Sequence, residues 1–496
     1  MLAGIAACGL LLFNTASRKG STDYADLDAY RRLWGDLAIA ITSYLDQRFP
    51  AAVVRAEPAV EMGLVLPSAA DVYRRILLDR IAKEDVRPTQ FWRTVKVQAF
   101  LRERGQVGRP LFEDPGRAWL LAAGFRALGG ISPFLLLWLG ALVCCPILLW
   151  TAWEFFDAGQ SWSGIAFLAV LASSPFVVEV LAFPRSSAGF YVLASLLLAP
   201  LAVYGILGRP TVRGLLLRAL AGGLLFALAA LCRSGALFLL LGFFLALAVA
   251  ARRALAMLTP SRWLLLFAAT SGLFLAPYLA VRPTQHHDIW SAVWEGLGDF
   301  DRSKGYTWSD AAAEKVAQAA GASTLKTPQA EAVLRAMVLS DIRRDPLWFA
   351  GILARRLFAT VTQQKLWPWA PLDGVSMAPS TSPNEGFMHK YFRYTYTVDF
   401  LCLGNRQWEI PISLLGLPTL VFAALAGVAW WRRSPADPRM GSGLLLLLTM
   451  ALATLPLPVL ISTAGGQETQ TFALAYFLGF GLLAEYLMGR ARKRRD

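Results

Sequence analysis

Residues 219–250 read ALAGGLLFALAALCRSGALFLLLGFFLALAVA, an apolar run that carries one charged residue, Arg233, near its middle. A bilayer core about 30 Å thick is crossed by about 20 helical residues, so this run is too long for one transmembrane helix. A charged side chain at membrane depth is costly and is a functional hypothesis by default. We therefore predict two short spans that meet at Arg233.

Apolar runs recur along the rest of the chain, which has 496 residues, 56% of them apolar and 17% charged. Soluble domains are about 45–50% apolar and about 25% charged, so the composition argues against an ordinary cytosolic enzyme, a disordered chain and a collagen-like chain. With the opening run, the sequence predicts an all-α polytopic membrane protein of about ten spans. The further runs are 2–13, 131–151, 163–183, 187–207, 263–281, 411–431, 443–462 and 471–488.

The net charge of +14 is concentrated in a few short segments. Short basic loops stay in the cytoplasm, which predicts the orientation of the spans in the inner (plasma) membrane. These segments are Arg209–Arg218, Arg252–Arg262, Arg432–Arg439 and the tail Arg490–Arg495. The two long segments, 16–130 and 282–410, then lie on the extracytoplasmic side.

The opening run 2–13 has a second interpretation, because it is short and is followed by Arg18 and Lys19. It could be a signal-like segment, but no A-x-A-like cleavage site follows it, so we interpret it as a span. The chain then divides into three parts. They are an N-terminal transmembrane module (1–281, spans 1–7, with the loop 16–130), an extracytoplasmic segment (282–410) and a C-terminal transmembrane module with a basic tail (411–496).

Both long segments carry helical patterns. In the first, Arg117–Leu128 is amphipathic and leads into a span, which predicts a helix on the membrane surface. In the second, Ala311–Gln364 reads as helical with a break at Asp345-Pro346, and Leu366–Arg406 reads as irregular. Leu347–Phe358 is a second interfacial candidate. Its apolar residues Trp348, Phe349, Ile352, Leu353 and Leu357 are set against Arg355 and Arg356.

Several short motifs occur in an order that points to one family. They are Asp23-Tyr-Ala-Asp26-Leu-Asp28-Ala-Tyr30, Arg109-Pro-Leu-Phe-Glu113-Asp114-Pro-Gly116 with the helix Ala118–Gly129 after it, Ala230-Leu-Cys-Arg233-Ser, and Asp341-Ile-Arg-Arg-Asp345-Pro-Leu-Trp-Phe349. Together with the predicted topology, this order resembles the GT-C superfamily of integral-membrane glycosyltransferases, which includes protein O-mannosyltransferases and lipid A aminoarabinose transferases. The chain departs from the family in two places. The loop Pro184-Arg185-Ser-Ser187 lacks an acid, and Arg282-Pro283 stands where many members have Arg-Asn.

The resemblance implies transfer of a sugar from a polyprenyl-phosphate donor to a glycan, lipid or protein acceptor at the extracytoplasmic face. Such a reaction needs a base for the acceptor hydroxyl and cations for the phosphate. The base candidates are Asp23, which lies nearest the first span, then Asp26 and Asp28, and Glu113 and Asp114. Each acid also has an ordinary explanation, a helix cap for the first group and an Asp-Pro-Gly turn for the second.

The phosphate candidates are Arg233 first, then Arg185 and Arg282. Glu179 lies inside a span and is expected either to pair with Arg185 or Arg233 or to line the site. His286, His287 and Trp290 are candidate sugar or acceptor contacts, with a loop at the membrane rim as the plainer alternative. The sequence specifies no cofactor, leaves a divalent cation open, and indicates membrane lipid but no nucleic acid as a partner.

Two other functions compete with sugar transfer. A lipid or glycan transporter or flippase typically shows an internal repeat with broken spans in matching halves, and the two long segments follow spans one and seven without such a match. A non-catalytic membrane assembly protein needs neither Arg233 nor the acid cluster. The cysteines Cys8, Cys144, Cys145 and Cys232 lie in apolar runs, so a disulfide framework is not expected.

Overall fold

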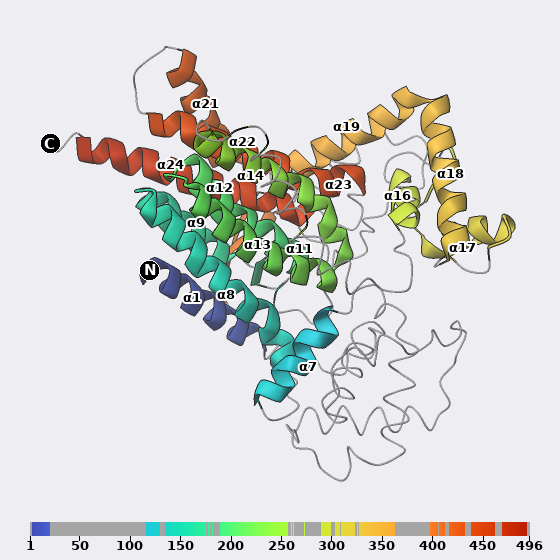
Figure 1. Ribbon diagram of the computed structural model, residues 1–496, viewed down its shortest axis with the longest axis horizontal. Coiled ribbons are helices and arrows are strands. Elements are labelled where there is room, and N and C mark those ends of the chain that lie inside the picture. Colours follow the sequence, from blue (N-terminus) through green and yellow to red (C-terminus); the bar gives the residue numbers. More distant parts are fainter. Residues whose placement is uncertain are drawn as a thin grey trace, which may run out of the picture.

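The structure of the chain is a computed structural model, shown as a ribbon in Figure 1. It describes residues 2–19, 116–128, 134–174, 177–178, 181, 189–255, 259, 261, 272, 289–298, 303–307, 309–322, 325, 327–362, 397–404, 406–411, 416–431, 438–461 and 469–493.

The described elements are mostly helices, and many are apolar. Three helical stretches are long and apolar enough to cross a membrane: Trp138–Asp157, Val212–Cys232 and Met440–Leu460. Shorter apolar helices accompany them: Leu2–Ser17, Ser161–Ser173, Phe190–Ile206, Gly235–Leu245 and Leu417–Ala429. The part of the chain that the structure describes is therefore mostly helical and has the helices of a membrane protein. The scheme of about ten spans stays a prediction.

These helices form one bundle, in which α24 packs on α9 and α21, α1 on α8 and α9, and α12 on α14, α8 and α22. Their bounds are α1 Leu2–Lys19, α8 Phe134–Asp157, α9 Ser161–Ser173, α11 Gly189–Leu196, α12 Leu198–Ile206, α13 Val212–Cys232, α14 Leu240–Leu255, α21 Leu417–Trp431, α22 Pro438–Thr454, α23 Pro456–Leu460 and α24 Ala473–Lys493.

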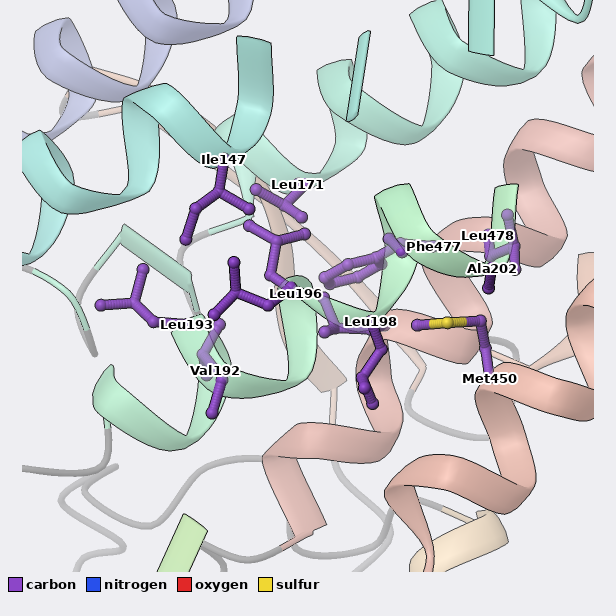
Figure 2. Close-up of a cluster of buried hydrophobic side chains, with 14 of the residues drawn as sticks. Ile147, Leu171, Val192, Leu193, Leu196, Leu198, Ala202, Met450, Phe477 and Leu478 are labelled. Carbon is purple, nitrogen blue, oxygen red and sulfur yellow. The ribbon is translucent and has the colours of Figure 1, made fainter. Parts of the chain in front are cut away.

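The α11–α12 segment lies at the centre of the bundle. Every residue of α12 is buried, and α11 is broken from it only at Leu197. Figure 2 shows side chains of α8, α9, α22 and α24 packed around it, among them Ile147, Leu171, Met450 and Phe477. The sequence run 187–207 reads as an ordinary span, but the structure makes it the central element that other helices enclose. A helix that is apolar on all sides suits that position.

Hydrogen bonds sort the helix ends into two groups. The Glu485 carboxylate, in the second half of α24, accepts the backbone N–H groups of Trp162 and Ser163 at the start of α9 (2.9 and 3.1 Å). The Asn14 amide near the end of α1 donates to the carbonyl of Ala172 near the end of α9 (2.9 Å). Figure 1 accordingly shows the start of α1 and the end of α24 on the left, and α7 (Gly116–Leu128) with α16–α18 toward the right.

We name the two ends by their arginines. The basic end holds the start of α13, with Arg213 and Arg218, and the end of α24, with Arg490. The Arg233 end holds the end of α13 and the helices that pack beside it. Of the arginines predicted for the cytoplasmic side, Arg213, Arg218 and Arg490 thus lie at the end of the bundle opposite Arg233.

The long apolar run is broken at Arg233, as predicted. Arg233 ends α13 in an extended conformation (φ −155°, ψ 98°), and a 3₁₀ helix, η3 (Ser234–Leu239), joins it to α14. The prediction of two short spans is wrong for the first one, because α13 has 21 residues and begins at Val212. Thr211 caps its start by accepting the Gly214 N–H (3.1 Å). Arg213 and Arg218 therefore lie in a helix and not in a basic loop.

The helices α16–α19 form a separate small core beside the Arg233 end (Figure 1). The break at Asp345-Pro346 is confirmed, since the Asp345 carboxylate caps α19 by accepting the Trp348 N–H (3.0 Å). The structure adds a break that the helical pattern of 311–364 concealed, at Gly321, whose φ is +89°. The bounds are α16 Ile289–Leu297, α17 Asp310–Ala319, α18 Pro328–Arg344 and α19 Pro346–Thr362.

A β-hairpin corrects the prediction that 366–406 is irregular throughout. Strand β1 (Thr397–Leu403) pairs antiparallel with β2 (Arg406–Pro411), and Gly404 follows β1 at φ +60°. The buried Asn14 of α1 holds this hairpin. Its amide nitrogen donates to the Cys402 carbonyl (3.3 Å), and its amide oxygen accepts the Gly404 N–H (2.8 Å). The hairpin therefore belongs to the end of the bundle where α1 and α9 end.

Candidate functional site

The elements that follow or precede membrane helices meet at the Arg233 end. Helix α7 packs on α13 and α8, η3 packs on α11 and α23, and α19 packs on α23 and on η5 (Thr469–Phe472). The contact of α7 is close, since a Cβ on Gly116 would lie 2.7 Å from the backbone nitrogen of Cys232. The helix that the sequence predicts at 117–128 is thus present as α7, and it begins against Cys232, the residue before Arg233.

Arg233 is half-buried and is oriented by a tyrosine of the central helix. Its Nε donates to the hydroxyl oxygen of Tyr191 (3.0 Å), and its guanidinium lies 5.3 Å from the centre of the same ring. Gly235 permits this contact, because a Cβ there would collide with the Tyr191 hydroxyl. A guanidinium stays charged and presents a planar fork of donors that suits a phosphate. The helix break therefore places a fixed, partly accessible cation at the end of the bundle.

A second arginine, Arg356, joins α19 to the same end. Its side chain is fully buried, and its Nη1 donates to the carbonyls of Val459 and Leu460 (both 3.1 Å), which are the last residues of α23. A positive charge at the carboxyl end of a helix satisfies carbonyls that have no partner within the helix. Gly296 of α16 lies against this guanidinium, since a Cβ there would come within 2.8 Å of its Nη2.

Arg356 corrects the sequence interpretation of α19. The pattern set Arg355 and Arg356 on a polar face opposite the apolar residues, but Arg356 lies on the buried face with Ile352 and Thr360. Positions four residues apart share a helix face, so these three residues point toward the bundle together. The exposed face is apolar instead, and includes Leu347 and Leu357.

Trp290 lies in the α16–α19 core and not beside Arg233. Its backbone N–H, and that of Ser291, donate to the Glu331 carboxylate of α18 (3.1–3.2 Å), while Arg335 covers its ring at 5.8 Å. Burial raises the pKa of Glu331, and the two N–H donors oppose that rise. The contacts of Trp290 are those of a helix start that packs on its neighbour, so a loop at the membrane rim is wrong for this residue, and its role as a sugar or acceptor contact stays a prediction.

The same core holds a stack of aromatic rings. Tyr306 lies between Trp294 and Trp348, with ring centres 5.4 and 5.7 Å away. Its hydroxyl donates to the Asp341 carboxylate (2.7 Å), and burial together with that carboxylate raises the pKa of Tyr306. Lys304 covers the Trp348 ring at 4.3 Å. The rings are covered by each other and by the lysine, so this cluster stabilises the unit and does not offer an open face.

Most of the predicted site residues lie outside the described residues. These are the acids Asp23, Asp26, Asp28, Glu113, Asp114 and Glu179, the arginines Arg185 and Arg282, and the histidines His286 and His287. Among the residues that the structure does describe, no group of three or more His, Cys, Asp or Glu side chains could hold a metal ion. The described cysteines, Cys8, Cys144, Cys145, Cys232 and Cys402, are all free thiols, in agreement with their apolar surroundings.

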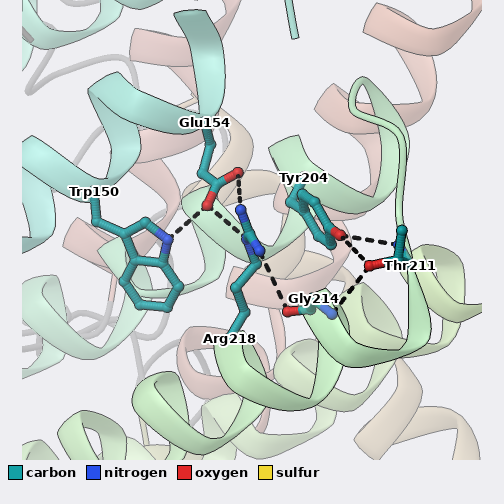
Figure 3. Close-up of polar contacts among 6 residues, drawn as sticks. All are labelled: Trp150, Glu154, Tyr204, Thr211, Gly214 and Arg218. Atoms are coloured by element: carbon teal, nitrogen blue, oxygen red, sulfur yellow. Dashed lines mark hydrogen bonds and ion pairs between the residues drawn. The ribbon is translucent and has the colours of Figure 1, made fainter. Parts of the chain in front are cut away.

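The basic end contains a buried ion pair that the sequence interpretation missed. The Arg218 guanidinium donates to both oxygens of Glu154 (2.6 and 3.1 Å), and Trp150 Nε1 donates to the same carboxylate (2.8 Å). Figure 3 shows how Tyr204 lies against this arginine, its ring centre 3.6 Å from the guanidinium, while its hydroxyl accepts the Thr211 N–H. The available signal was Glu154, an acid that closely follows the apolar run 131–151.

No known family model, curated protein or solved structure matches this chain.

Proposed function

We propose that the chain transfers a sugar from a polyprenyl-phosphate donor to an acceptor at the Arg233 end of the bundle. The observation that carries the proposal is the half-buried Arg233 at the break between α13 and η3, aligned by Tyr191. A lipid-linked donor brings its phosphate to the ends of membrane helices, which is where this guanidinium lies. A charge–phosphate contact there is worth more than in water, because the surroundings are less polar.

The arrangement of the ends supports the same proposal. The arginines of α13 and α24 gather at the opposite end, so the distribution of positive charge favours an extracytoplasmic Arg233 end. The α16–α19 unit then lies outside the membrane, and so do the acids that follow α1. The acceptor base is proposed among those acids, with Asp23 preferred and Glu113 or Asp114 in reserve.

The reaction needs three groups with separate tasks. The Arg233 guanidinium stabilises the negative charge that grows on the departing polyprenyl phosphate. Tyr191 holds that guanidinium through its hydroxyl and its ring. The carboxylate takes the proton from the acceptor hydroxyl as the oxygen attacks the sugar carbon, in one displacement that inverts the anomeric centre. The bond from that carbon to the phosphate oxygen breaks as the new glycosidic bond forms.

The test is sugar transfer by the purified chain in lipid nanodiscs. Polyprenyl-phosphate donors with labelled sugars are supplied with membrane lipid and glycan acceptors, and release of polyprenyl phosphate is measured. Arg233→Ala should abolish turnover and donor binding, and Arg233→Lys should retain part of both, since an ammonium is a point charge without the fork. Lys315→Ala, at an exposed site on α17, is the matched control.

Two outcomes would overturn the proposal. One is normal turnover by Arg233→Ala in protein that inserts and purifies like the parent. The other is movement of labelled donor across the membrane of vesicles that contain the chain, without any sugar transfer, which would establish a flippase. Broken helices also form the binding sites of transporters, so both activities are measured on the same preparation.

A further inference from the structure

The exposed side of α13 combines a leucine row with two arginines. Leu216, Leu217, Leu220 and Leu224 are each between 38% and 57% exposed. They recur at three- and four-residue spacing, so they share one helix face. Arg213 precedes them on that face and is exposed, and Arg209 is exposed just before the helix. The surface therefore changes from apolar to strongly cationic at the start of one membrane helix.

Arg218 is excluded from this surface by its own contacts. It turns inward, binds both oxygens of Glu154 and lies against Tyr204 (Figure 3). The three arginines Arg209, Arg213 and Arg218 look equivalent in the sequence. The structure assigns one of them to the interior and leaves the other two on the surface.

The depth of the two surface arginines follows from the neighbouring helix. Trp153 of α8 is 52% exposed, and an exposed tryptophan near a helix end favours the membrane–water interface. The next residue, Glu154, fixes the level of Arg218. Arg213 lies five positions earlier in α13, or about 7.5 Å further along its axis at 1.5 Å per residue. That displacement carries it from the aromatic belt toward the lipid phosphates.

We propose that this surface, formed by Arg209, Arg213 and the leucines Leu216, Leu217, Leu220 and Leu224, binds an anionic glycerophospholipid. The two guanidiniums contact the phosphate, and the leucines contact the acyl chains. Charge selects the headgroup, because an ammonium-bearing headgroup would place a third cation beside the two arginines. Juxtamembrane arginines favour anionic lipid in this way in other membrane proteins. The proposal does not depend on the proposed enzymatic activity, which lies at the opposite end.

The test is lipid binding to the detergent-purified full chain, followed by native mass spectrometry. The probes are phosphatidylglycerol and phosphatidylcholine with identical acyl chains, and inorganic phosphate serves as competitor. The parent should retain phosphatidylglycerol preferentially. The double variant Arg209→Gln/Arg213→Gln should weaken that binding by about 30-fold, and each single variant by about fivefold. Lys315→Gln/Arg335→Gln, exposed residues of α17 and α18, is the charge-matched control and should bind like the parent.

A second variant keeps the test independent of charge. Leu217→Gln leaves both arginines in place and should weaken the binding of both lipids, because it disturbs the contact with the acyl chains. Thermal unfolding of each variant without added lipid checks that the fold is retained. The proposal would be overturned if Arg209→Gln/Arg213→Gln and Lys315→Gln/Arg335→Gln lost phosphatidylglycerol binding to the same extent. It would also be overturned if the parent retained both lipids equally. Displacement of the lipid by inorganic phosphate at equal concentration would show a free-anion site and would overturn it too.

Discussion

The Glu154 carboxylate and the Arg218 guanidinium form a two-bond ion pair between α8 and α13, with N–O distances of 2.6 and 3.1 Å. The Glu154 side chain is 1% exposed and that of Arg218 is 20% exposed. Trp150 and Tyr204 complete the surroundings, so each charge is met on more than one side. The pair ties α8 to α13, and both of these helices pack on α12.

Removing one partner of this pair should destabilise the protein strongly. Arg218→Met leaves the Glu154 carboxylate buried without its counter-charge, at a cost of about 3–5 kcal/mol, and Glu154→Gln should cost less because Arg218 is partly exposed. Thermal unfolding in detergent measures the change. The double variant Glu154→Leu/Arg218→Leu should recover much of the loss, because it leaves no buried charge. If each single variant unfolds like the parent, the pair contributes nothing to stability.

Asn14 should be required to hold the β-hairpin on the bundle. Asn14→Leu leaves the Ala172 and Cys402 carbonyls and the Gly404 N–H without their partner, at about 1–3 kcal/mol for each buried group left unpaired. We expect earlier thermal unfolding and faster proteolysis in the hairpin. Leu2→Ala removes an exposed side chain at the opposite end of the same helix and is the control. Equal proteolysis of the two variants would contradict the assignment.

Packing of α16 on α18 should tighten as the pH falls. Because burial raises the pKa of Glu331 in the folded chain, the protonated form is favoured by folding. Its stabilising contribution is complete below the ordinary pKa of the carboxyl and is lost as the pH rises through the raised value. Hydrogen exchange of the α16 amides, corrected for intrinsic rates, should slow on acidification from neutral pH. Glu331→Gln keeps an acceptor oxygen for Trp290 and Ser291 and should abolish this pH dependence.

The base assignment predicts a large loss from a small change. Asp23→Asn preserves shape and removes charge, so turnover should fall at least about a hundredfold while donor binding is retained. Asp26→Asn and Asp28→Asn should be milder, and Glu113→Gln and Asp114→Asn test the reserve candidates. Measurement of kcat and of donor Kd separates catalysis from binding. Parent-like turnover in all five variants would remove the base from these segments and leave Glu179 to be tested.

The two ends of the bundle should label from opposite sides of the membrane. A cysteine at exposed Ala336 of α18 should react with an impermeant maleimide from outside in intact cells. A cysteine at exposed Ala491, near the end of α24, should react only after the membrane is opened. We expect this difference because arginines gather at the end of the bundle where α24 ends, and basic segments stay in the cytoplasm. The reverse order of labelling would move the Arg233 end, and the proposed transfer reaction, to the cytoplasmic side.

The sequence by itself determined the class of protein, most helix positions and the helix breaks at Arg233 and at Asp345-Pro346. These follow from local chemistry: apolar length, a charge that an unbroken membrane helix would bury at high cost, and a proline that cannot continue a helix. The candidate role of Arg233 came from the same reasoning. The sequence does not distinguish the surface arginine Arg213 from the inward-facing Arg218 and Arg356, because a sequence pattern shows where a charge lies along the chain but not which group it pairs with.

Only the tertiary structure decided what each of those arginines does. Arg218 pairs with Glu154, which lies 64 residues earlier in the sequence. Arg356 donates to carbonyls of α23, which begin 103 residues later in the sequence. The short β-hairpin likewise depends on Asn14, 388 residues from the Cys402 carbonyl it binds. Burying a charged or polar group is favourable only where a partner is already placed. The arrangement of distant elements supplies that partner, so periodicity along the chain does not reveal it.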